Sequence, residues 1–333
     1  MLRFFSKTVS KMASPQDRIA FIGLGVMGYP MAKNLRKKID RNQTLVICDV
    51  AKDALERFRS ETREFGPVEI VANGYEALQS AETVITMLPS AEAVRDVYLN
   101  PQTGIFAAAK PIGSGDSKKL VIECGTIAQA TIAGIFEESK KLNMTYIDAP
   151  VSGGPMGSEA GTLSFMVGCD VDIFQTVRKL LSFMGKEDSI FRCGGVGAGT
   201  AFKIINNYIS IISVLNVSEA LNIASKMNLD MKLLVDLINS SSGQCWVTSK
   251  NNPVPGIHLN APASNGYEGG FRIELAGKVL GLGKELAEMV GAQTFLDKTA
   301  LDAFGTAASD PRYAGKDARV VYKWLNEYET KAD

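Results

Sequence analysis

The sequence predicts an α/β fold, in which a doubly wound parallel sheet is followed by an all-α domain. Three observations predict it. A glycine-rich turn joins a short apolar strand to an amphipathic helix near the beginning of the chain. Strand-like and helix-like segments then alternate through the first half, and from Gly199 onward the pattern changes to long helices with few strand signals. We therefore expect a first domain over residues 17–196 and a helical domain over residues 197–330.

The glycine-rich turn lies in the segment RIAFIGLGVMGYPMAKNLRKK, which starts at Arg18. Its first residues are strand-like, and Gly23, Gly25 and Gly28 follow in a GxGxxG frame that leads into a helix. In such a frame the first glycine makes the tight turn, the second lets the backbone approach a pyrophosphate, and the third lets helix and strand pack closely. The helix N-terminus then offers N–H groups to the anion. The segment predicts a Rossmann-like dinucleotide site.

The next strand-like segment, TLVICD, ends at Asp49, about 20 residues after Gly28. An acid at that spacing can hold the ribose 2′-hydroxyl of NAD, and it repels the 2′-phosphate of NADP. NAD is therefore the expected cofactor, although the nearby Lys52 weakens the preference. The alternative interpretation is a plain glycine turn followed by a surface aspartate.

The alternation of strands and helices continues through the first half. Because parallel sheets bind ligands at the carboxyl ends of their strands, the loops MLPS at 87–90 and ECGT at 123–126 are candidate site loops, although each could be a plain strand-to-helix connection. We expect strands at 18–22, 44–49, 81–88, 119–124, 144–147 and 161–168, with an edge strand near 190, and helices at 53–63 and 129–142.

The segment DAPVSGGPMGS, which starts at Asp148, is a candidate substrate loop. Pro150 stiffens its entry, and Ser152, Gly153 and Gly154 expose a hydroxyl and backbone N–H groups without bulky side chains. Such a surface suits a carboxylate. A glycine-rich linker is the competing interpretation.

The second half is expected to form helices at 200–226, 232–240, 275–290 and 294–309. At the start of the first helix, GAGTAFKIINN places Lys203 and Asn207 four residues apart and therefore on one face. This helix links the two domains, and we expect a cleft at its first turns. The alternative is a solvated lysine whose stem covers apolar surface. The small and apolar neighbours of Lys203 favour desolvation, which would lower its pKa from the ordinary value of about 10.4 toward that of a useful base.

Charge and cysteine content exclude several classes of site. The 36 basic residues balance the 36 acidic ones, so neither nucleic acid nor a membrane surface is an expected partner. The apolar run that begins at Ile204 is interrupted by polar residues, which favours a buried core helix over a membrane span. The five cysteines are far apart and His258, in the loop PVPGIHLNAP, lacks partners, so we expect reduced thiols and no metal.

The first residues, MLRFFSKTVSKMAS, carry basic and hydroxyl side chains and no acid before Asp17. This composition is typical of a mitochondrial targeting segment, and we assign residues 1–16 to it. A disordered tail and an alternative start at Met12 are the other interpretations. The long apolar helices of the second half also suggest a homo-oligomer, either a dimer or a tetramer.

The chain resembles the β-hydroxyacid dehydrogenase family from about Arg18 to its end. FIGLGVMGYPMAKNL resembles the cofactor signature of the family, DAPVSGG its substrate signature and GAGTAFKIINN its catalytic signature. Three further segments resemble the branch that acts on 3-hydroxyisobutyrate: SSGQCW at Ser241, NPVPG at Asn252, and GYEGGF, which ends at Phe271. Several motifs in the same order are harder to obtain by chance than any one of them.

The resemblance implies a role for each matching position. Lys203 matches the catalytic lysine, which exchanges a proton with the substrate hydroxyl, and Asn207 matches the asparagine that orients the substrate. Ser152, Gly153 and Gly154 match the residues that hold the substrate carboxylate. The positions that match cofactor-binding residues are Gly23, Leu24, Gly25, Val26, Met27, Gly28, Asp49, Leu88, Pro89, Thr126, Phe271 and Lys278.

The implied activity is oxidation of a β-hydroxyacid, 3-hydroxyisobutyrate in the first place, to its semialdehyde with NAD+, as in valine catabolism in the mitochondrial matrix (EC 1.1.1.31). The alternatives are a related β-hydroxyacid dehydrogenase or semialdehyde reductase, and a non-catalytic dinucleotide-binding interaction protein. Three departures from the family pattern bear on cofactor affinity and substrate preference. Ala93 replaces a frequent asparagine, ECGT replaces a DSST-like loop, and Val279 follows Lys278 where an aspartate is common.

Overall fold

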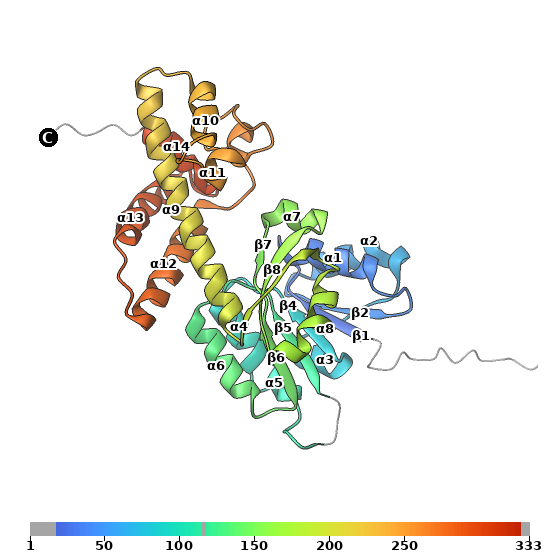
Figure 1. The fold of residues 1–333 in the computed structure, drawn as a ribbon. Coiled ribbons are helices and arrows are strands. Elements are labelled where there is room, and N and C mark those ends of the chain that lie inside the picture. Colours follow the sequence, from blue (N-terminus) through green and yellow to red (C-terminus); the bar gives the residue numbers. More distant parts are fainter. Residues whose placement is uncertain (1–17, 115–117, 328–333) are drawn as a thin grey trace, which may run out of the picture. The chain divides into compact units, whose positions relative to one another are not determined.

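The computed structural model describes residues 18–114 and 118–327 (Figure 1). The chain divides into two compact units, of which the first ends at Gly199 and the second begins at Thr200. We describe each unit by itself. The segment assigned to mitochondrial targeting, residues 1–16, lies outside the described residues.

The strands of the first unit form one sheet in the order β3-β2-β1-β4-β5-β6-β8-β7, with β9 paired to β8. Strands β1 to β6 are parallel, in the order found in dinucleotide-binding folds, so the predicted doubly wound parallel sheet is confirmed. Beyond β6 the sheet is mixed, because β8 runs antiparallel to β6 and β7. The strands are β1 (Arg18–Ile22), β2 (Thr44–Cys48), β3 (Val68–Ile70), β4 (Thr83–Thr86), β5 (Lys119–Glu123), β6 (Met144–Asp148), β7 (Val151–Ser152), β8 (Leu163–Gly168) and β9 (Gly185–Gly194).

Helices cover both faces of this sheet, so its central strands are apolar on both sides. On β1, Phe21 belongs to one hydrophobic cluster and Ala20 to the other, because successive side chains of a strand point to opposite faces. The helices of this unit are α1 (Gly28–Lys38), α2 (Lys52–Thr62), α3 (Gly74–Ser80), α4 (Ala91–Leu99), α5 (Ile105–Ala108), α6 (Gln129–Ser139), α7 (Gly154–Ala160) and α8 (Val171–Leu181), with a 3₁₀ turn at Arg63–Phe65.

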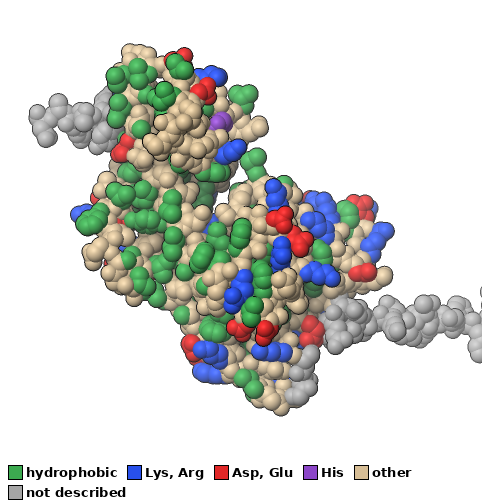
Figure 2. Space-filling model, in the orientation of Figure 1, with side chains coloured by type: hydrophobic (Ala, Val, Ile, Leu, Met, Phe, Trp, Pro, Cys, Tyr) green, Lys and Arg blue, Asp and Glu red, His purple; other side chains and the backbone are tan. Residues whose placement is uncertain are grey.

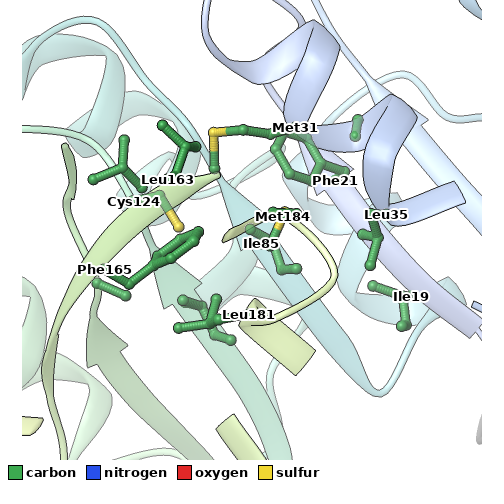
Figure 3. Packing of buried hydrophobic residues seen from close by; sticks show 14 of the residues in the cluster. Ile19, Phe21, Met31, Leu35, Ile85, Cys124, Leu163, Phe165, Leu181 and Met184 are labelled. Atoms are coloured by element: carbon green, nitrogen blue, oxygen red, sulfur yellow. The ribbon is translucent and has the colours of Figure 1, made fainter. Parts of the chain in front are cut away.

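Figure 3 shows the cluster on the α1 and α8 side of the sheet. Phe21 of β1 lies close to Met31 of α1, and Phe165 of β8 lies near Leu181 of α8. These side chains are fully buried. The opposite cluster includes Tyr98 of α4, whose ring packs edge-on against those of Phe106 and Tyr146. The two clusters hold the carboxyl ends of β1 to β6 in place.

The regular elements in the described part of the second unit are helices, as predicted. Its helices enclose a separate hydrophobic core that includes Val214, Leu280 and Phe304. Helix α9 runs across the boundary between the units. The helices are α9 (Ala198–Lys226), α10 (Met231–Asn239), α11 (Trp246–Ser249), α12 (Ile273–Val290), α13 (Leu296–Ser309) and α14 (Val321–Glu327), with 3₁₀ turns at Pro262–Asn265 and Ala318–Val320.

Helix α9 is only in part the buried core helix that we expected. Phe202, Ile205, Ile209 and Ile223 are each more than half exposed, and 39% of the most apolar 18-residue stretch of the helix is buried. Figure 2 shows hydrophobic side chains spread over the visible face of the helical unit, while charged side chains gather on the other unit. Among the described helices, α9 alone is long and apolar enough to cross a membrane by length and composition. One such helix is weak evidence for a span, because core helices of soluble proteins pass the same test.

His258 has a hydrogen-bond partner that the sequence did not reveal. It lies in a loop, as predicted, and its Nδ1 accepts the backbone N–H of Asn252 at 3.1 Å. This imidazole nitrogen is therefore an acceptor that helps to fold the loop. The five cysteines are free thiols. Within residues 18–114 and 118–327, no cluster of three or more His, Cys, Asp or Glu side chains could hold a metal ion.

Candidate active site

The carboxyl ends of the central strands lie side by side at one edge of the sheet. Gly23 donates its N–H to Cys48 at 2.9 Å, which joins the glycine turn to the end of β2. Similar backbone bonds continue along this edge, from Met87 to Ile22 at 2.9 Å, from Cys124 to Thr86 at 2.8 Å, and from Ala149 to Glu123 at 2.7 Å. The glycine turn, the MLPS and ECGT loops and the beginning of the substrate loop are thus neighbours in space.

Each glycine of the turn has its own physical requirement. Gly23 has a φ of 98°, and a Cβ there would lie 2.3 Å from the carbonyl oxygen of Met87. A Cβ on Gly28 would lie 1.9 Å from the carbonyl oxygen of Gly23, so α1 can begin here only with glycine. Gly25 is exposed, and apart from its own residue and its two chain neighbours no heavy atom of the described residues lies within 4 Å of a Cβ built on it. The open space beside Gly25 and the N-terminus of α1 fit the pyrophosphate of NAD.

The residues between these glycines alternate in exposure. Leu24 is buried in the core, Val26 is 75% exposed and Met27 is half-buried. Only Val26 therefore presents its side chain to solvent, next to the exposed Gly25. The three residues lie in the turn that the sequence assigned to the cofactor, and Leu24 anchors that turn in the core.

Asp49 lies directly after β2 and is tied to the glycine turn. One oxygen of its half-buried carboxylate accepts the N–H of Leu24, and the other accepts the N–H of Ala51 at 2.7 Å. A carboxylate oxygen has two lone pairs, so each oxygen can accept a further hydroxyl. The sequence suggested only the ribose contact, and the bond to Leu24 shows that Asp49 also fixes the turn.

The loops after β4 and β5 contain three further predicted cofactor residues. Leu88 is buried, Pro89 is exposed and Thr126 is half-buried. Ser90 caps the N-terminus of α4, because its hydroxyl accepts the N–H of Ala93 at 3.2 Å. Ala93, one of the three departures from the family pattern, thus has a local role through its backbone.

Glu123, the last residue of β5, is fully buried, and burial raises the pKa of its carboxyl to about 7. It is the first residue of the ECGT loop, and the sequence patterns indicate no role for it. The sequence signal that could have identified it is an acid directly after the apolar residues LVI, at the end of the strand KLVIE. A buried carboxyl at the ligand edge of a sheet needs a physical explanation.

The predicted carboxylate loop is an ordered strand, turn and helix, so the linker interpretation is wrong. Ser152 ends β7, and Gly153 and Gly154 follow with φ values of 136° and 62° at exposed positions. The helix that they start, α7, is tied to the cofactor helix, because Ser158 donates its hydroxyl to the carbonyl of Met27 at 2.8 Å. The loop is therefore held close to the glycine turn.

The small residues of GAGTAFKIINN allow the start of α9 to approach the sheet. A Cβ on Gly199 would lie 2.1 Å from the carbonyl oxygen of Met166 in β8. The fully buried carboxylate of Asp148 accepts the N–H of Gly197 at 2.7 Å. Asp148 therefore joins the first residue of the predicted substrate loop to the beginning of the helix that carries Lys203. No local sequence pattern indicates this role of Asp148.

Lys203 lies in the second turn of α9 with 7% of its surface exposed. Burial lowers the pKa of its ammonium group to about 8. The predicted desolvation is thus the cause of this shift. Asn207, one turn later on the same helix, is half-buried.

Helix α12 carries Lys278 and packs against α9. A Cβ on Gly283 of α12 would lie 2.5 Å from the Tyr208 ring of α9. Lys278 lies at an exposed position, and partial desolvation lowers the pKa of its ammonium group. The half-buried Phe271 precedes α12, and its N–H donates to Asp317 at 2.8 Å. Val279, another departure from the family pattern, belongs to the hydrophobic core of this unit.

Two family models together match almost the whole described chain. Residues 18–197 match the NAD binding domain of 6-phosphogluconate dehydrogenase. Residues 197–325 match a domain described as NAD-binding of NADP-dependent 3-hydroxyisobutyrate dehydrogenase. The first match contains the glycine turn, Asp49 and the substrate loop, and the second contains Lys203 and Lys278.

Similar proteins match over most of their own length. The chain is 37% identical over 324 residues to a probable mitochondrial 3-hydroxyisobutyrate dehydrogenase of Dictyostelium discoideum, covering 96% of this chain and 95% of that protein. It is 35% identical over 306 residues to an NAD-dependent L-serine dehydrogenase of Pseudomonas aeruginosa, covering 92% and 97%. A solved structure of Mycobacterium tuberculosis 3-hydroxyisobutyrate dehydrogenase with L-serine matches with a TM-score of 0.80 and 34% identity, covering 93% and 99%.

Proposed function

Because this chain belongs to the family of NAD-dependent β-hydroxyacid dehydrogenases related to 3-hydroxyisobutyrate dehydrogenase, we propose that it oxidises 3-hydroxyisobutyrate to the semialdehyde. The observation that carries this proposal is the buried Lys203, whose pKa of about 8 suits a general base. The first domain (17–196) would hold the cofactor, and the helical domain (197–330) would supply the base.

Residues of the first unit would hold NAD+. The turn from Gly23 to Gly28 and the N-terminus of α1 would contact the pyrophosphate, and Asp49 would accept a ribose hydroxyl. Leu88, Pro89 and Thr126 would lie along the nicotinamide half, and Phe271 and Lys278 would contribute from the helical unit. When bound, NAD+ supplies the acceptor for the hydride that leaves the substrate carbon.

Lys203 would accept the proton of the substrate hydroxyl. With a pKa of about 8, roughly a quarter of the side chain is the neutral amine at pH 7.5, compared with about 0.1% at the ordinary pKa of about 10.4. Asn207 would hold the same hydroxyl toward Lys203 through its amide. Ser152 and the exposed N–H groups of Gly153 and Gly154 would bind the substrate carboxylate, which keeps the acid in one orientation.

L-Serine is the second candidate substrate, because a 35% identical relative is named an L-serine dehydrogenase. Both acids carry a primary alcohol next to the carbon that bears the carboxylate. They differ at that carbon, where 3-hydroxyisobutyrate has a methyl group and serine an ammonium group. A methyl group gains from an apolar environment, whereas an ammonium group needs hydrogen-bond acceptors or an anion. The residues around that carbon therefore decide between the two.

An initial-rate panel tests the substrate proposal. Purified protein is assayed with 3-hydroxyisobutyrate, L-serine, glycerate, threonine and 4-hydroxybutyrate, each with NAD+ and with NADP+. We expect the highest kcat/KM for 3-hydroxyisobutyrate with NAD+, by about tenfold or more over serine, which corresponds to about 1.4 kcal/mol. A higher kcat/KM for serine would assign the chain to the second substrate. Normal NADH binding without turnover of any of these acids would favour a non-catalytic dinucleotide-binding protein.

Replacing Asp49 by alanine is expected to weaken NAD+ and to relax discrimination against NADP+, because no carboxylate then repels the 2′-phosphate. The ratio of kcat/KM for NAD+ to that for NADP+ should fall about tenfold, roughly 1.4 kcal/mol. The ratio is the informative quantity, since loss of the bond to Leu24 would weaken both cofactors alike. Asp53→Ala, at an exposed position in α2, serves as the matched control. An unchanged ratio in Asp49→Ala would show that Asp49 does not contact the ribose.

Self-association and mitochondrial location complete the proposal. The exposed Phe202, Ile205, Ile209 and Ile223 on α9 support a homo-oligomer, because apolar side chains gathered on a surface mark association sites. Sedimentation of a monomer alone at micromolar concentration would contradict this.

Relatives named as mitochondrial and the basic composition of residues 1–16 support a matrix location in valine catabolism. A fluorescent fusion of the full chain that stays outside mitochondria would contradict that location.

A further inference from the structure

We propose that Glu123 is a positioning residue whose buried carboxylate joins the loop after β4 to the loop after β5. These are the two loops that the proposed function places along the nicotinamide half of NAD, so the inference rests on that function. Glu123 would touch neither the cofactor nor the substrate. It would act by holding Leu88 and Thr126 at fixed positions relative to each other.

The carboxylate receives hydrogen bonds from the end of β4 and from the loop after β5. Thr86, at the end of β4, donates its hydroxyl to Oε2 at 2.6 Å. Gly125, in the loop after β5, donates its N–H to Oε1 at 2.6 Å. The backbone N–H of Leu88, in the loop after β4, also favours the ionised form of this carboxyl group and so lowers its pKa. One side chain therefore accepts bonds from two segments about 40 residues apart along the chain.

Tyr98 of α4 extends this network. Its hydroxyl lies 2.7 Å from Oγ1 of Thr86, and both residues are fully buried. Thr86 has a single hydroxyl proton, and an ionised carboxylate can only accept. Because Thr86 donates its hydroxyl hydrogen bond to Glu123, its oxygen can accept a hydrogen bond from the hydroxyl of Tyr98. The chain of hydrogen bonds thus connects the carboxylate to the helix that follows the first loop.

The two loops pack closely against each other at Gly125. A Cβ on Gly125 would lie 2.6 Å from Oε1 of Glu123 and 2.7 Å from the carbonyl oxygen of Leu88. The backbones of the two loops are thus in contact, with the carboxylate against both. A shorter or uncharged side chain at position 123 would have to move at least one loop to keep its hydrogen bonds.

Stability of the sheet does not by itself explain an acid at this position. Glu123 faces the same side of the sheet as Val84, Val121 and Tyr146, within a hydrophobic cluster. Burial in these surroundings makes the ionised form costly, whereas an apolar side chain would be buried at a gain. A carboxylate can accept hydrogen bonds from Thr86 and from Gly125 at the same time, and an apolar side chain cannot.

The test compares two ligands that share the adenosine half. NADH carries the nicotinamide ring, and ADP-ribose lacks it. We expect Glu123→Gln to lower the affinity for NADH about fivefold or more, measured by fluorescence titration. The affinity for ADP-ribose, measured by calorimetry, should stay within twofold of the wild-type value. Glu138→Gln, in an exposed ion pair on α6, is the matched control and should change neither. Equal weakening of both ligands, or no change in either, would overturn the proposal.

A second variant keeps the proposal testable if Glu123→Gln does not fold. Thr86→Val removes one donor to the carboxylate with little change of shape, and we expect about threefold weaker NADH with unchanged ADP-ribose. Equal effects on the two ligands would again overturn the proposal. Both measurements are of binding, so they remain informative if the chain turns over no hydroxyacid. The proposed substrate is tested by turnover and this inference by binding, so the two can be contradicted independently.

Discussion

Replacement of Lys203 by alanine is expected to lower kcat with 3-hydroxyisobutyrate by about 10³-fold, while the Kd for NADH changes less than about twofold. The reason is that Lys203 would accept the hydroxyl proton, whereas the residues that would hold the pyrophosphate and ribose lie in the other unit. Steady-state kinetics and fluorescence titration measure the two quantities.

Two further variants separate the role of Lys203 from general damage to α9. Lys203→Arg keeps a cation that cannot serve as a base near neutral pH, so its kcat should be almost as low as that of the alanine variant. Lys226→Ala, at the exposed end of the same helix, removes a lysine that donates to Asn326 at 3.1 Å and should leave kcat unchanged. Near-normal turnover by Lys203→Ala would exclude this residue as the general base.

The pH dependence follows from the pKa of about 8 for Lys203. Below pH 8 the side chain is protonated and cannot accept a proton, so kcat for alcohol oxidation should rise with pH and level off above about 8.

Burial of Lys203 also makes the stability of the fold depend on pH. The folded pKa lies below the unfolded value, so the unfolded state binds more protons between about pH 8 and 10, and stability rises with pH across that range. At pH 7 Lys203→Met should therefore be more stable than the wild type, by an amount on the order of 3 kcal/mol at most.

Replacement of Gly28 by alanine is expected to have the second large effect, loss of both fold stability and cofactor binding. The new Cβ would lie 1.9 Å from the carbonyl oxygen of Gly23, and this backbone atom cannot move without opening the turn. We expect the free energy of unfolding to fall by about 2–4 kcal/mol and NADH binding to be lost. Urea unfolding and fluorescence titration measure these changes.

Gly25→Ala is the matched control for Gly28→Ala. Within the part of the chain that the structure describes, no atom lies within 4 Å of the new Cβ. Stability should stay within about 0.5 kcal/mol, whereas NADH binding should weaken about tenfold, because the methyl group would stand where the pyrophosphate approaches. Normal NADH binding by Gly25→Ala would show that the pyrophosphate does not bind at this turn. Wild-type stability of Gly28→Ala would show that the turn tolerates a Cβ.

Much of the fold could be predicted from the sequence because its long elements have strong periodicity. The first strand has the predicted bounds, Arg18–Ile22, and helix α9 begins at Ala198, two residues before the predicted start. The sequence patterns did not indicate β3 (Val68–Ile70) or β7 (Val151–Ser152). Elements of two or three residues have no measurable period, and they form because neighbouring strands offer hydrogen bonds.

The sequence by itself determined the alternation of strands and helices in the first half, the glycine spacing of the turn and the acid after the second strand, and with them the NAD-binding fold. These features depend on residues close together in the chain, where backbone geometry and side-chain period decide the structure. Only the tertiary structure decided that Lys203 is buried, that the outer face of α9 is exposed and that Glu123 joins two loops. Burial and hydrogen-bond partners depend on side chains that are far apart in the sequence, and a local pattern does not contain them.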